Sequence, residues 1–292
     1  MSPLRILYRG PLASCNYDCG YCPFGKVTIR QDELDADFQA LGRFVGRITE
    51  MRRPISVFFT PWGEALIHEA YQRAIAELTQ LDHVVRVAAQ TNLSWSTRWL
   101  ESVDPEILAL WVTWHPQYMP LPTLLDRCRQ LSAAGVRHSV GIVGQREHFD
   151  AIAAARRSLP ADTYLWVNAN KRIVPGYSAA ELDFLEAIDP LFSKNLRPYS
   201  SAGLPCGAGE TSVTVDGDGV VRRCHFIDAP IGHVSELDAA LAPRDCSNAE
   251  CRCHIGYVNL PASGVGDLFG DGLLERIPAP TWPGWGAWRV LE

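Results

Sequence analysis

The sequence lacks the marks of a secreted or membrane-bound protein. Its first ten residues, MSPLRILYRG, do not form the long apolar run of a signal peptide. Nowhere does the chain contain eighteen consecutive apolar residues free of charge, which a membrane-spanning helix would need. We therefore expect a cytoplasmic protein without a membrane partner.

An excess of positive charge is also lacking. The net charge is −6 and the isoelectric point lies near 5.8, so the chain has no general attraction to phosphate backbones. No internal repeat or low-complexity tract stands out. We do not expect nucleic acid as a partner.

What the chain does contain is ample apolar material and nine cysteines. With 292 residues, 47% hydrophobic and 21% charged, it suits one large α/β domain with a small appendage. Reducing compartments do not sustain disulfide frameworks, so nine cysteines in a cytoplasmic chain indicate metal binding or catalysis.

Three of the cysteines lie close together near the start, in the segment CNYDCGYC that contains Cys15, Cys19 and Cys22. Closely spaced thiolates hold iron–sulfur clusters. Three thiolates leave one iron of a [4Fe–4S] cluster open, much as a catalytic zinc keeps a free coordination position. A zinc knuckle and reduced structural thiols are the alternatives. A zinc knuckle needs a fourth cysteine or histidine nearby, and the next histidine is His68.

This CxxxCxxC spacing, with an aromatic residue before the third thiol, resembles the signature of the radical S-adenosylmethionine (SAM) family. The resemblance implies that SAM fills the open position of the cluster and that Tyr21 lies beside the adenine. It further implies that one-electron reduction, by a partner such as flavodoxin or ferredoxin, splits SAM into methionine and a 5′-deoxyadenosyl radical. That radical then abstracts hydrogen from a substrate.

Short apolar segments alternate with helix-length segments as far as about residue 190. The expected strands are residues 5–8, 55–60, 84–89, 110–114, 139–143 and 164–167, and the expected helices are residues 32–52, 65–80, 96–103, 122–134 and 147–159. A capping-box pattern at Ser178 and Glu181 predicts the start of a sixth helix. Such alternation builds a parallel sheet, and six units predict an α/β fold, a partial (β/α)6 TIM-like barrel. Ligands of such barrels bind at the carboxyl ends of the strands. The cysteine triad lies in the loop directly after the first expected strand, so we expect it at this end of the barrel.

The loops after the other expected strands carry weaker markers of the same family. Trp62-Gly63-Glu64 resembles the Gly-Gly-Glu element, which implies that Gly63 and Glu64 contact the methionyl amino group of SAM. Further contacts that the resemblance implies are Asn92 at the methionyl end, Thr113 at the ribose, Ile142 and Gly144 in the adenine motif, and Asn168 at adenine or substrate. The chain departs from the family where Trp62, Leu93 and Val140 replace glycines.

His115 follows the fourth expected strand and stands directly before a proline. It is our candidate catalytic residue, as a substrate contact or an acid–base group. A hydrogen bond to a neighbouring loop is an equally good interpretation.

A second group of cysteines begins at a predicted hairpin of residues 211–215 and 220–226, joined by Asp-Gly-Asp-Gly. Cys206 and Cys224 bracket the hairpin, and Gly219 stands five positions before Cys224. This spacing resembles the opening of the family's SPASM and twitch domains, which implies an auxiliary [4Fe–4S] cluster. The candidate ligands are Cys206, Cys224, Cys246, Cys251 and Cys253.

Five cysteines remain for this cluster once the triad and Cys128, expected as a small buried residue on a helix, are set aside. They suffice for one auxiliary cluster. Cys206, Cys224 and Cys251 are favoured, with Cys253 or Cys246 as the fourth ligand. A zinc site is the alternative, since zinc also binds four thiolates and His225 or His254 could complete the set.

The domain organisation follows from these patterns. We expect the barrel at residues 1–200, a twitch-like domain at 201–260, and a tail at 261–292 that packs on the barrel. The tail contains the segment TWPGWGAWRV, which is too apolar to remain free in water. By covering the barrel, the tail would exclude water from the radical.

An auxiliary cluster can accept the electron left on a substrate radical, so we expect an oxidative reaction. The favoured substrate is a ribosomally made peptide. A radical SAM dehydrogenase that acts on a small natural product or a sugar is the alternative. A zinc-binding structural protein and an iron–sulfur electron-transfer protein are the alternatives from other classes.

Overall fold

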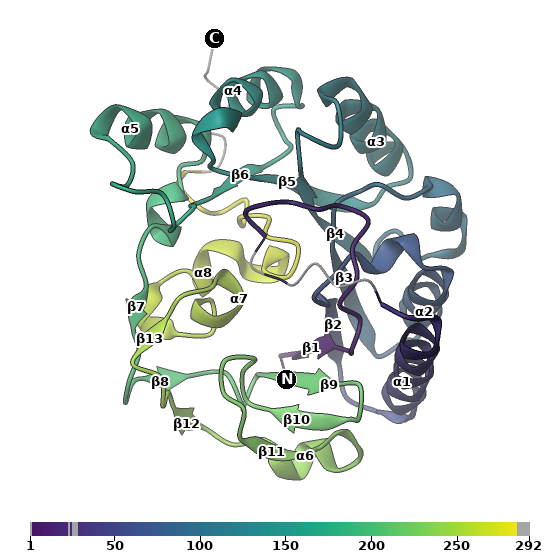
Figure 1. Ribbon diagram of the computed structural model, residues 1–292. Coiled ribbons are helices and arrows are strands. Elements are labelled where there is room, and N and C mark those ends of the chain that lie inside the picture. Colours follow the sequence, from purple (N-terminus) through teal and green to yellow (C-terminus); the bar gives the residue numbers. More distant parts are fainter. Residues whose placement is uncertain (1, 23, 25–28, 285–292) are drawn as a thin grey trace.

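The computed structural model describes residues 2–22, 24 and 29–284 (Figure 1). Its centre is a curved sheet in which six parallel strands follow one another in chain order. They are β1 (Leu4–Arg9), β2 (Ile55–Phe59), β3 (Val84–Thr91), β4 (Leu108–Trp114), β5 (Arg137–Val143) and β6 (Leu165–Asn168). Each begins and ends within two residues of the strand that the sequence predicts. The predicted α/β class with a partial (β/α)6 barrel is confirmed.

Helices cover the outside of this sheet (Figure 1). They are α1 (Gln31–Glu50), α2 (Glu69–Thr79), α3 (Leu121–Ala133), α4 (Phe149–Ser158) and α5 (Ala179–Ile188). The predicted capping box is formed at α5, because the Ser178 hydroxyl accepts the Glu181 N–H and the Glu181 carboxylate accepts the Ser178 N–H. No helix in the described part of the chain is long and apolar enough to cross a membrane.

Two predicted helices differ in detail. The segment 96–103 forms the 3₁₀ helix η2 (Thr97–Ser102), and the segment 65–80 is divided into η1 (Ala65–Ile67) and α2. The remaining short helices are η3 (Arg146–His148), η4 (Phe192–Asn195), η5 (Val234–Glu236), α6 (Leu237–Ala240), α7 (His254–Tyr257), η6 (Pro261–Ser263), α8 (Gly266–Phe269) and η7 (Gly270–Gly272).

The two faces of the sheet bury different residues, because successive side chains of a strand point to opposite faces. On β1, Ile6 and Tyr8 belong to the core shared with the helices, whereas Leu7 belongs to the core inside the barrel. The inner core of the barrel also contains Phe58, Ala88, Ala109, Trp111 and Trp166. The barrel is therefore filled at mid-height by aromatic rings.

The predicted hairpin continues the barrel sheet. β9 (Ser212–Asp216) pairs in parallel with β1, and β10 (Val220–Arg222) and β11 (Pro230–His233) follow as antiparallel strands. The result is one sheet of nine strands in the order β11-β10-β9-β1-β2-β3-β4-β5-β6. At the turn, the Asp216 carboxylate accepts the N–H groups of Asp218 and Val220, and Gly219 has a φ of 80°.

Two small ribbons lie beside the hairpin. β8 (Pro205–Cys206) pairs with β12 (Arg244–Asp245), and β7 (Tyr199–Ser200) pairs with β13 (Glu250–Cys251). The first pairing joins segments about forty residues apart in the sequence and the second joins segments about fifty residues apart. Each ribbon carries one of the candidate cysteine ligands, Cys206 on β8 and Cys251 on β13.

The segment after residue 260 enters the barrel, where it lies inside the ring of strands (Figure 1). Phe269, Leu273 and Leu274 join the inner core. The Glu275 carbonyl accepts the Ser139 hydroxyl at 2.6 Å, and the Glu275 carboxylate lies 2.9 Å from the Arg137 guanidinium. Because Arg137 and Ser139 lie at the start of β5, this segment closes the amino-terminal end of the barrel. Trp285 and Trp288 of the predicted tail lie outside the described residues.

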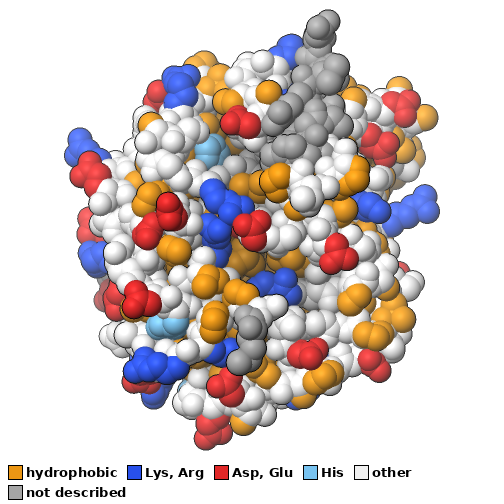
Figure 2. Space-filling view, turned by 180° about the vertical axis from the view of Figure 1, so that it is seen from behind, with side chains coloured by type: hydrophobic (Ala, Val, Ile, Leu, Met, Phe, Trp, Pro, Cys, Tyr) orange, Lys and Arg blue, Asp and Glu red, His pale blue; other side chains and the backbone are white. Residues whose placement is uncertain are grey.

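Seen from behind, the surface carries basic, acidic and apolar side chains side by side (Figure 2). This mixture agrees with a composition of 27 basic and 33 acidic residues.

Candidate functional site

The loop that contains the cysteine triad is held firmly at the carboxyl end of β1. The first part of the loop is held by α1, because the Leu12 N–H donates to the buried Asp37 carboxylate at 3.0 Å. The loop after β2 then runs against it, since the Trp62 N–H donates to the Leu12 carbonyl and the Glu64 N–H to the Ser14 carbonyl. The two loops therefore meet at the carboxyl ends of the strands, where barrels of this kind bind their ligands.

Gly63 is required for this contact. A Cβ atom at position 63 would lie 1.7 Å from the carbonyl oxygen of Ser14, far inside the contact distance of two atoms. The sequence prediction assigns Gly63 to SAM, and the structure gives it in addition a steric role in the approach of the two loops.

The three thiols differ in exposure: Cys15 is exposed, Cys22 half-buried and Cys19 buried. The Tyr17 N–H donates to the Cys15 sulfur at 3.4 Å, and the Asn92 amide nitrogen lies 3.9 Å from it. Burial raises the pKa of Cys19 to about 11 and also raises the pKa of Cys15. Without a metal these two thiols are protonated at neutral pH, so metal binding must release their protons.

The donor set fits a [4Fe–4S] cluster with one open iron. Three thiols stand on one short loop, and amide donors that can hydrogen-bond cluster sulfur lie beside Cys15. Among the described residues, no three His, Cys, Asp or Glu side chains are already grouped at metal-binding distances.

His115 belongs to the surroundings of the triad. Its Nδ1 atom lies 3.3 Å from the Cys19 sulfur and 2.7 Å from the Tyr21 hydroxyl oxygen, and its ring stacks on the Tyr21 ring. Burial lowers the pKa of His115 to about 4, so the ring is neutral at physiological pH. Of the two interpretations of the sequence, this geometry favours the contact with a neighbouring loop.

Glu64 is fully enclosed, with 3% of its surface exposed. Its carboxylate accepts the Asn92 N–H at 2.6 Å, the Thr91 hydroxyl at 2.8 Å and the Leu66 N–H at 3.1 Å. The carboxylate therefore ties the end of β3 to the loop after β2. Burial raises the pKa of Glu64 to about 7 despite these donors.

A polar row crosses the inner face of the barrel near its carboxyl end. The Thr60 hydroxyl donates to the Gln90 side-chain oxygen at 2.8 Å, and the Gln90 amide donates to the Thr113 hydroxyl at 3.4 Å. Thr113 therefore lies on the inner face of the barrel, near the carboxyl end of β4. Gln90 sits between the two threonines but was not among the predicted site residues.

The other predicted SAM contacts lie on β5, on β6 and in the loops that follow. The Gly144 N–H donates to the Asn168 carbonyl, and a Cβ at position 144 would lie 2.9 Å from the Tyr177 hydroxyl. Asn168 is exposed, and its neighbour Asn170 donates to Gln145. The Ile142 side chain is buried in the core shared with the helices, so only its backbone faces the barrel interior.

The five later cysteines gather in one region, although Cys206, Cys224, Cys246 and the pair Cys251 and Cys253 come from four separate segments. Cys224 is close enough to Cys206, Cys246 and Cys253 to interact with them electrostatically. Cys251 is equally close to the other four cysteines. Burial raises the pKa of Cys224 to about 11 and that of Cys251 to about 12. The donor set fits one metal–thiolate site with a spare cysteine.

His225 and His254, which could complete a zinc site, lie in different surroundings. The His225 Nδ1 atom lies 4.0 Å from the Cys224 sulfur. The His254 ring is buried edge-on against Trp111 and Phe269, with ring centroids 5.3 and 5.1 Å away. His254 therefore packs into the inner core of the barrel.

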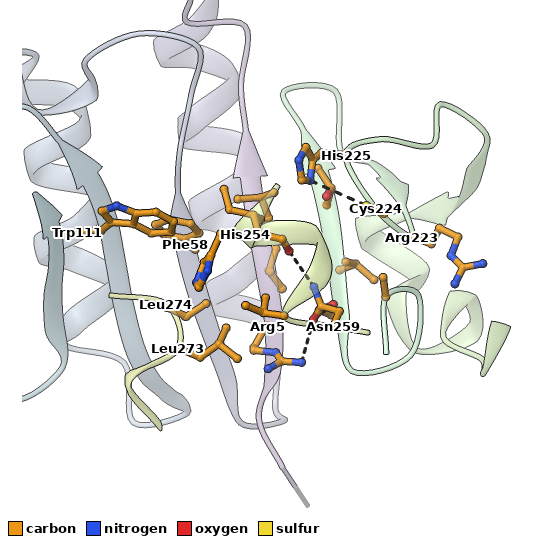
Figure 3. A pocket seen from close by; sticks show the side chains of 18 residues that line it. Arg5, Phe58, Trp111, Arg223, Cys224, His225, His254, Asn259, Leu273 and Leu274 are labelled. Atoms are coloured by element: carbon orange, nitrogen blue, oxygen red, sulfur yellow. Dashed lines mark hydrogen bonds between the residues drawn. The ribbon is translucent and has the colours of Figure 1, made fainter. Parts of the chain in front are cut away.

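A cavity of about 40 Å³ connects this cysteine region to the barrel interior. Figure 3 shows it between the inner face of β1 and α7, with Phe58 and Trp111 on one side and Cys224 and His225 on the other. Its volume suits one or a few water molecules and is far too small for SAM or a peptide.

No family model matches the sequence, and no curated protein matches it. The fold, however, is similar to solved structures. Native anSMEcpe with bound AdoMet and the Kp18Cys peptide has a TM-score of 0.54 and 12% identity over 80% of this chain and 78% of its own. The same protein with the Cp18Cys peptide has a TM-score of 0.52, 13% identity and the same coverage.

Streptococcus suis SuiB bound to S-adenosylmethionine has a TM-score of 0.50 and 12% identity over 81% of this chain and 65% of its own. At such low identity the similarity establishes the fold. The chain has the fold of radical SAM enzymes.

Proposed function

We propose that this chain is a radical SAM enzyme, with a [4Fe–4S] cluster on Cys15, Cys19 and Cys22. The observation that carries the proposal is the position of the triad loop, at the carboxyl end of β1 in a barrel with the fold of SAM-binding structures. The chemistry that such a cluster supplies is one-electron reduction of SAM, which yields methionine and a 5′-deoxyadenosyl radical.

The chain's own residues bind and orient the cofactor. Asn92 and Thr113 present polar side chains at the ends of β3 and β4, where they would hold the methionyl end and the ribose of SAM. Glu64 fixes the loops that carry them through its three hydrogen bonds. The segment 265–276 excludes water from the amino-terminal end of the barrel, because Phe269, Leu273 and Leu274 fill the interior.

We also propose an auxiliary [4Fe–4S] cluster on four of the five later cysteines. The support is that the chain gathers Cys206, Cys224, Cys246, Cys251 and Cys253 in one region beside the barrel. β9 and β10 carry this region on the same sheet as β1. A second redox group beside the barrel suits an oxidative reaction, because the reaction must remove an electron from the substrate radical.

The proposed substrate is a ribosomally made peptide. Support comes from two solved structures of anSMEcpe that hold the peptides Cp18Cys and Kp18Cys and share this fold. Peptides encoded beside the gene are the first substrates to test. A loss of two hydrogen atoms from such a peptide, detected by mass spectrometry, would identify the reaction.

The cluster proposal is tested by anaerobic reconstitution and metal analysis. The unmodified chain should bind about eight iron atoms, four for each cluster, and form 5′-deoxyadenosine when reduced with dithionite in the presence of SAM. Replacing all three triad cysteines by alanine should leave about four iron atoms and no deoxyadenosine. Cys128→Ala, on α3, is the matched control and should change neither result. Zinc in place of iron, or deoxyadenosine formation without the triad, would overturn the proposal.

A further inference from the structure

Arg9 is a buried cation that the proposed function does not use. It is the last residue of β1, and 9% of its surface is exposed. Its side chain lies on the inner face of the sheet, because it alternates along the strand with Leu7 of the inner core. The guanidinium carbon lies 4.4 Å from the centroid of the Trp62 ring and 5.8 Å from that of Phe24. Both rings stand in loops that follow the carboxyl ends of strands, so the guanidinium is directed toward that end of the barrel.

Arg9 extends the polar row of the inner face by one strand. The residues of the inner core on β1 and β2, Leu7 and Phe58, are paired in register. Two residues further along the same face stand Arg9 and Thr60, and the Thr60 hydroxyl donates to Gln90 at 2.8 Å. The apolar layer at mid-height is therefore followed by a polar layer, and of these three polar side chains only Arg9 is charged.

No acid balances this charge among the residues that the structure describes. Within them, no ion pair or side-chain hydrogen bond includes Arg9, and its Nε atom is buried without a partner. Asp216 stands opposite Arg9 in the register of β1 and β9, but its carboxylate is engaged in the hairpin turn and pairs with Arg222 at 2.6 Å. A buried cation without a partner is costly, and an anion that accepts its N–H groups offsets this cost. The surroundings of Arg9 therefore suit an anionic ligand.

The ligand that this geometry suits best is a carboxylate. The aromatic rings contact the face of the guanidinium, whereas its N–H groups lie in its plane, where a carboxylate accepts two of them side by side. The proposed enzyme offers two such groups, the methionyl carboxylate of SAM and a carboxylate of the peptide. The side chains proposed to hold SAM, those of Asn92 and Thr113, stand at the ends of β3 and β4, whereas Arg9 ends β1 beside β9. This separation favours the peptide.

We propose that Arg9 determines substrate specificity by binding a carboxylate group of the peptide. This inference rests on the proposed function, in which a peptide is the substrate. The guanidinium holds the carboxylate by two charge-assisted hydrogen bonds, and the Trp62 ring keeps the guanidinium in place. A peptide with an amide at the same position leaves the buried cation unpaired and binds less tightly.

The test compares the binding of two capped amino acids to the reconstituted full-length chain in the presence of SAM. N-acetylglutamate α-methylamide has a carboxylate where N-acetylglutamine α-methylamide has an amide, and ligand-observed NMR gives both dissociation constants. The unmodified chain should bind the glutamate compound at least about tenfold more tightly. Arg9→Gln should remove this preference, and Arg9→Lys, which keeps the charge but not the planar fork, should retain part of it. N-acetylalanine carries its carboxylate at the chain terminus, so the tighter of the two acids shows whether a side chain or a terminus is bound.

Arg5→Gln is the matched control. Arg5 also lies on the inner face of β1, but at the amino-terminal end of the strand. Its guanidinium has partners, because it donates to Asn259 at 3.0 Å and to Thr211 at 3.3 Å. Arg5→Gln should therefore keep the preference for the glutamate compound. Absence of a preference in the unmodified chain, or an equal loss in Arg5→Gln and Arg9→Gln, would overturn the inference.

Two further measurements separate carboxylate binding from other roles of Arg9. Arg9→Gln should be at least as stable in urea as the unmodified chain, because it removes an unpaired buried cation; a folding equilibrium constant lowered more than about tenfold would show a structural role instead. The KM for SAM in deoxyadenosine formation without peptide should not change in Arg9→Gln. A rise of about tenfold would assign Arg9 to the methionyl carboxylate and overturn the inference. Absence of deoxyadenosine from the unmodified chain would instead refute the proposed function, since the binding comparison needs no turnover.

Discussion

The Nδ1 atom of His115 lies 3.3 Å from the Sγ atom of Cys19. The same nitrogen lies 2.7 Å from the Tyr21 hydroxyl oxygen, so one imidazole joins the loop after β4 to two positions of the cysteine triad loop. A neutral ring can share this nitrogen between them without introducing charge beside a thiolate. We therefore interpret His115 as a residue that orients the triad loop.

His115→Ala should weaken the triad loop. The change removes the ring from between Tyr21 and Cys19, and loss of such outer contacts commonly costs 10–100-fold in metal affinity. We expect iron to leave the triad at least about tenfold faster when a chelator is added, as followed by absorbance. Gln117→Ala is the control, because the exposed Gln117 donates to the Tyr21 hydroxyl and, among the described residues, has no hydrogen bond to a cysteine of the triad. Equal iron loss from the two variants would contradict this role of His115.

Gly63→Ala should prevent assembly of the site. The added Cβ would collide with the carbonyl of Ser14 at 1.7 Å, and backbone atoms cannot give way as a flexible side chain does. We expect loss of the triad iron and of deoxyadenosine formation, measured after anaerobic reconstitution. Gly20→Ala is a sharp control because it lies within the triad loop itself, yet a Cβ there meets no atom within 4 Å. A fully loaded and active Gly63→Ala variant would disprove the steric argument.

Arg137→Ala should open the amino-terminal end of the barrel. The Glu275 side chain has no exposed surface, so the change would leave a buried carboxylate without its nearest cation. Breaking such a pair costs about 3 kcal/mol, to be measured as free energy of unfolding in urea. The double variant Arg137→Met with Glu275→Leu should recover most of this loss, because a hydrophobic pair needs no desolvation of charge. A double variant as unstable as the single one would contradict the argument.

Asp37→Asn should change how stability depends on pH. Burial raises the pKa of Asp37 to about 6, above its ordinary value of 3.8. The folded chain therefore holds this proton more tightly than the unfolded chain, and the resulting stabilisation is lost as the pH rises from about 4 to about 6.

The free energy of unfolding of the unmodified chain, relative to Asp37→Asn, should fall by up to about 3 kcal/mol across this range. Urea titrations at pH 4, 5, 6 and 7 would measure it. Asparagine keeps an oxygen that can accept the Leu12 N–H and the Tyr71 hydroxyl, so the triad loop remains anchored. Parallel stability profiles for the two proteins would show that Asp37 does not titrate as described.

The sequence predicts the barrel well because its signals are local. Apolar runs, their spacing and the capping box at Ser178 need no knowledge of distant residues. The pairing of β9 with β1 has no local signal, because it joins residues such as Ile6 and Val213 that are far apart in the chain. The ion pair between Arg137 and Glu275, which closes the barrel end, likewise joins residues far apart in the chain and has no local signal.

The same distinction applies to the site. The triad was recognisable because its three cysteines share one short segment. The contact of Cys19 with His115 spans 96 residues, and the sequence left two roles for the histidine open.

The continuous sheet has a consequence for electron transfer. β1 leads into the triad loop and β9 leads through its hairpin to Cys224, and the two strands are joined in register, with Arg9 opposite Asp216. The triad loop and Cys224 thus follow strands of one sheet, whereas Cys206 and Cys251 lie on the separate ribbons β8–β12 and β7–β13. A slip of β9 by one register step would move Cys224 relative to the triad loop by about 3.3 Å and turn every side chain of the strand to the opposite face. In the proposed enzyme, the backbone hydrogen bonds between β1 and β9 would therefore set the tunnelling distance from the triad to Cys224.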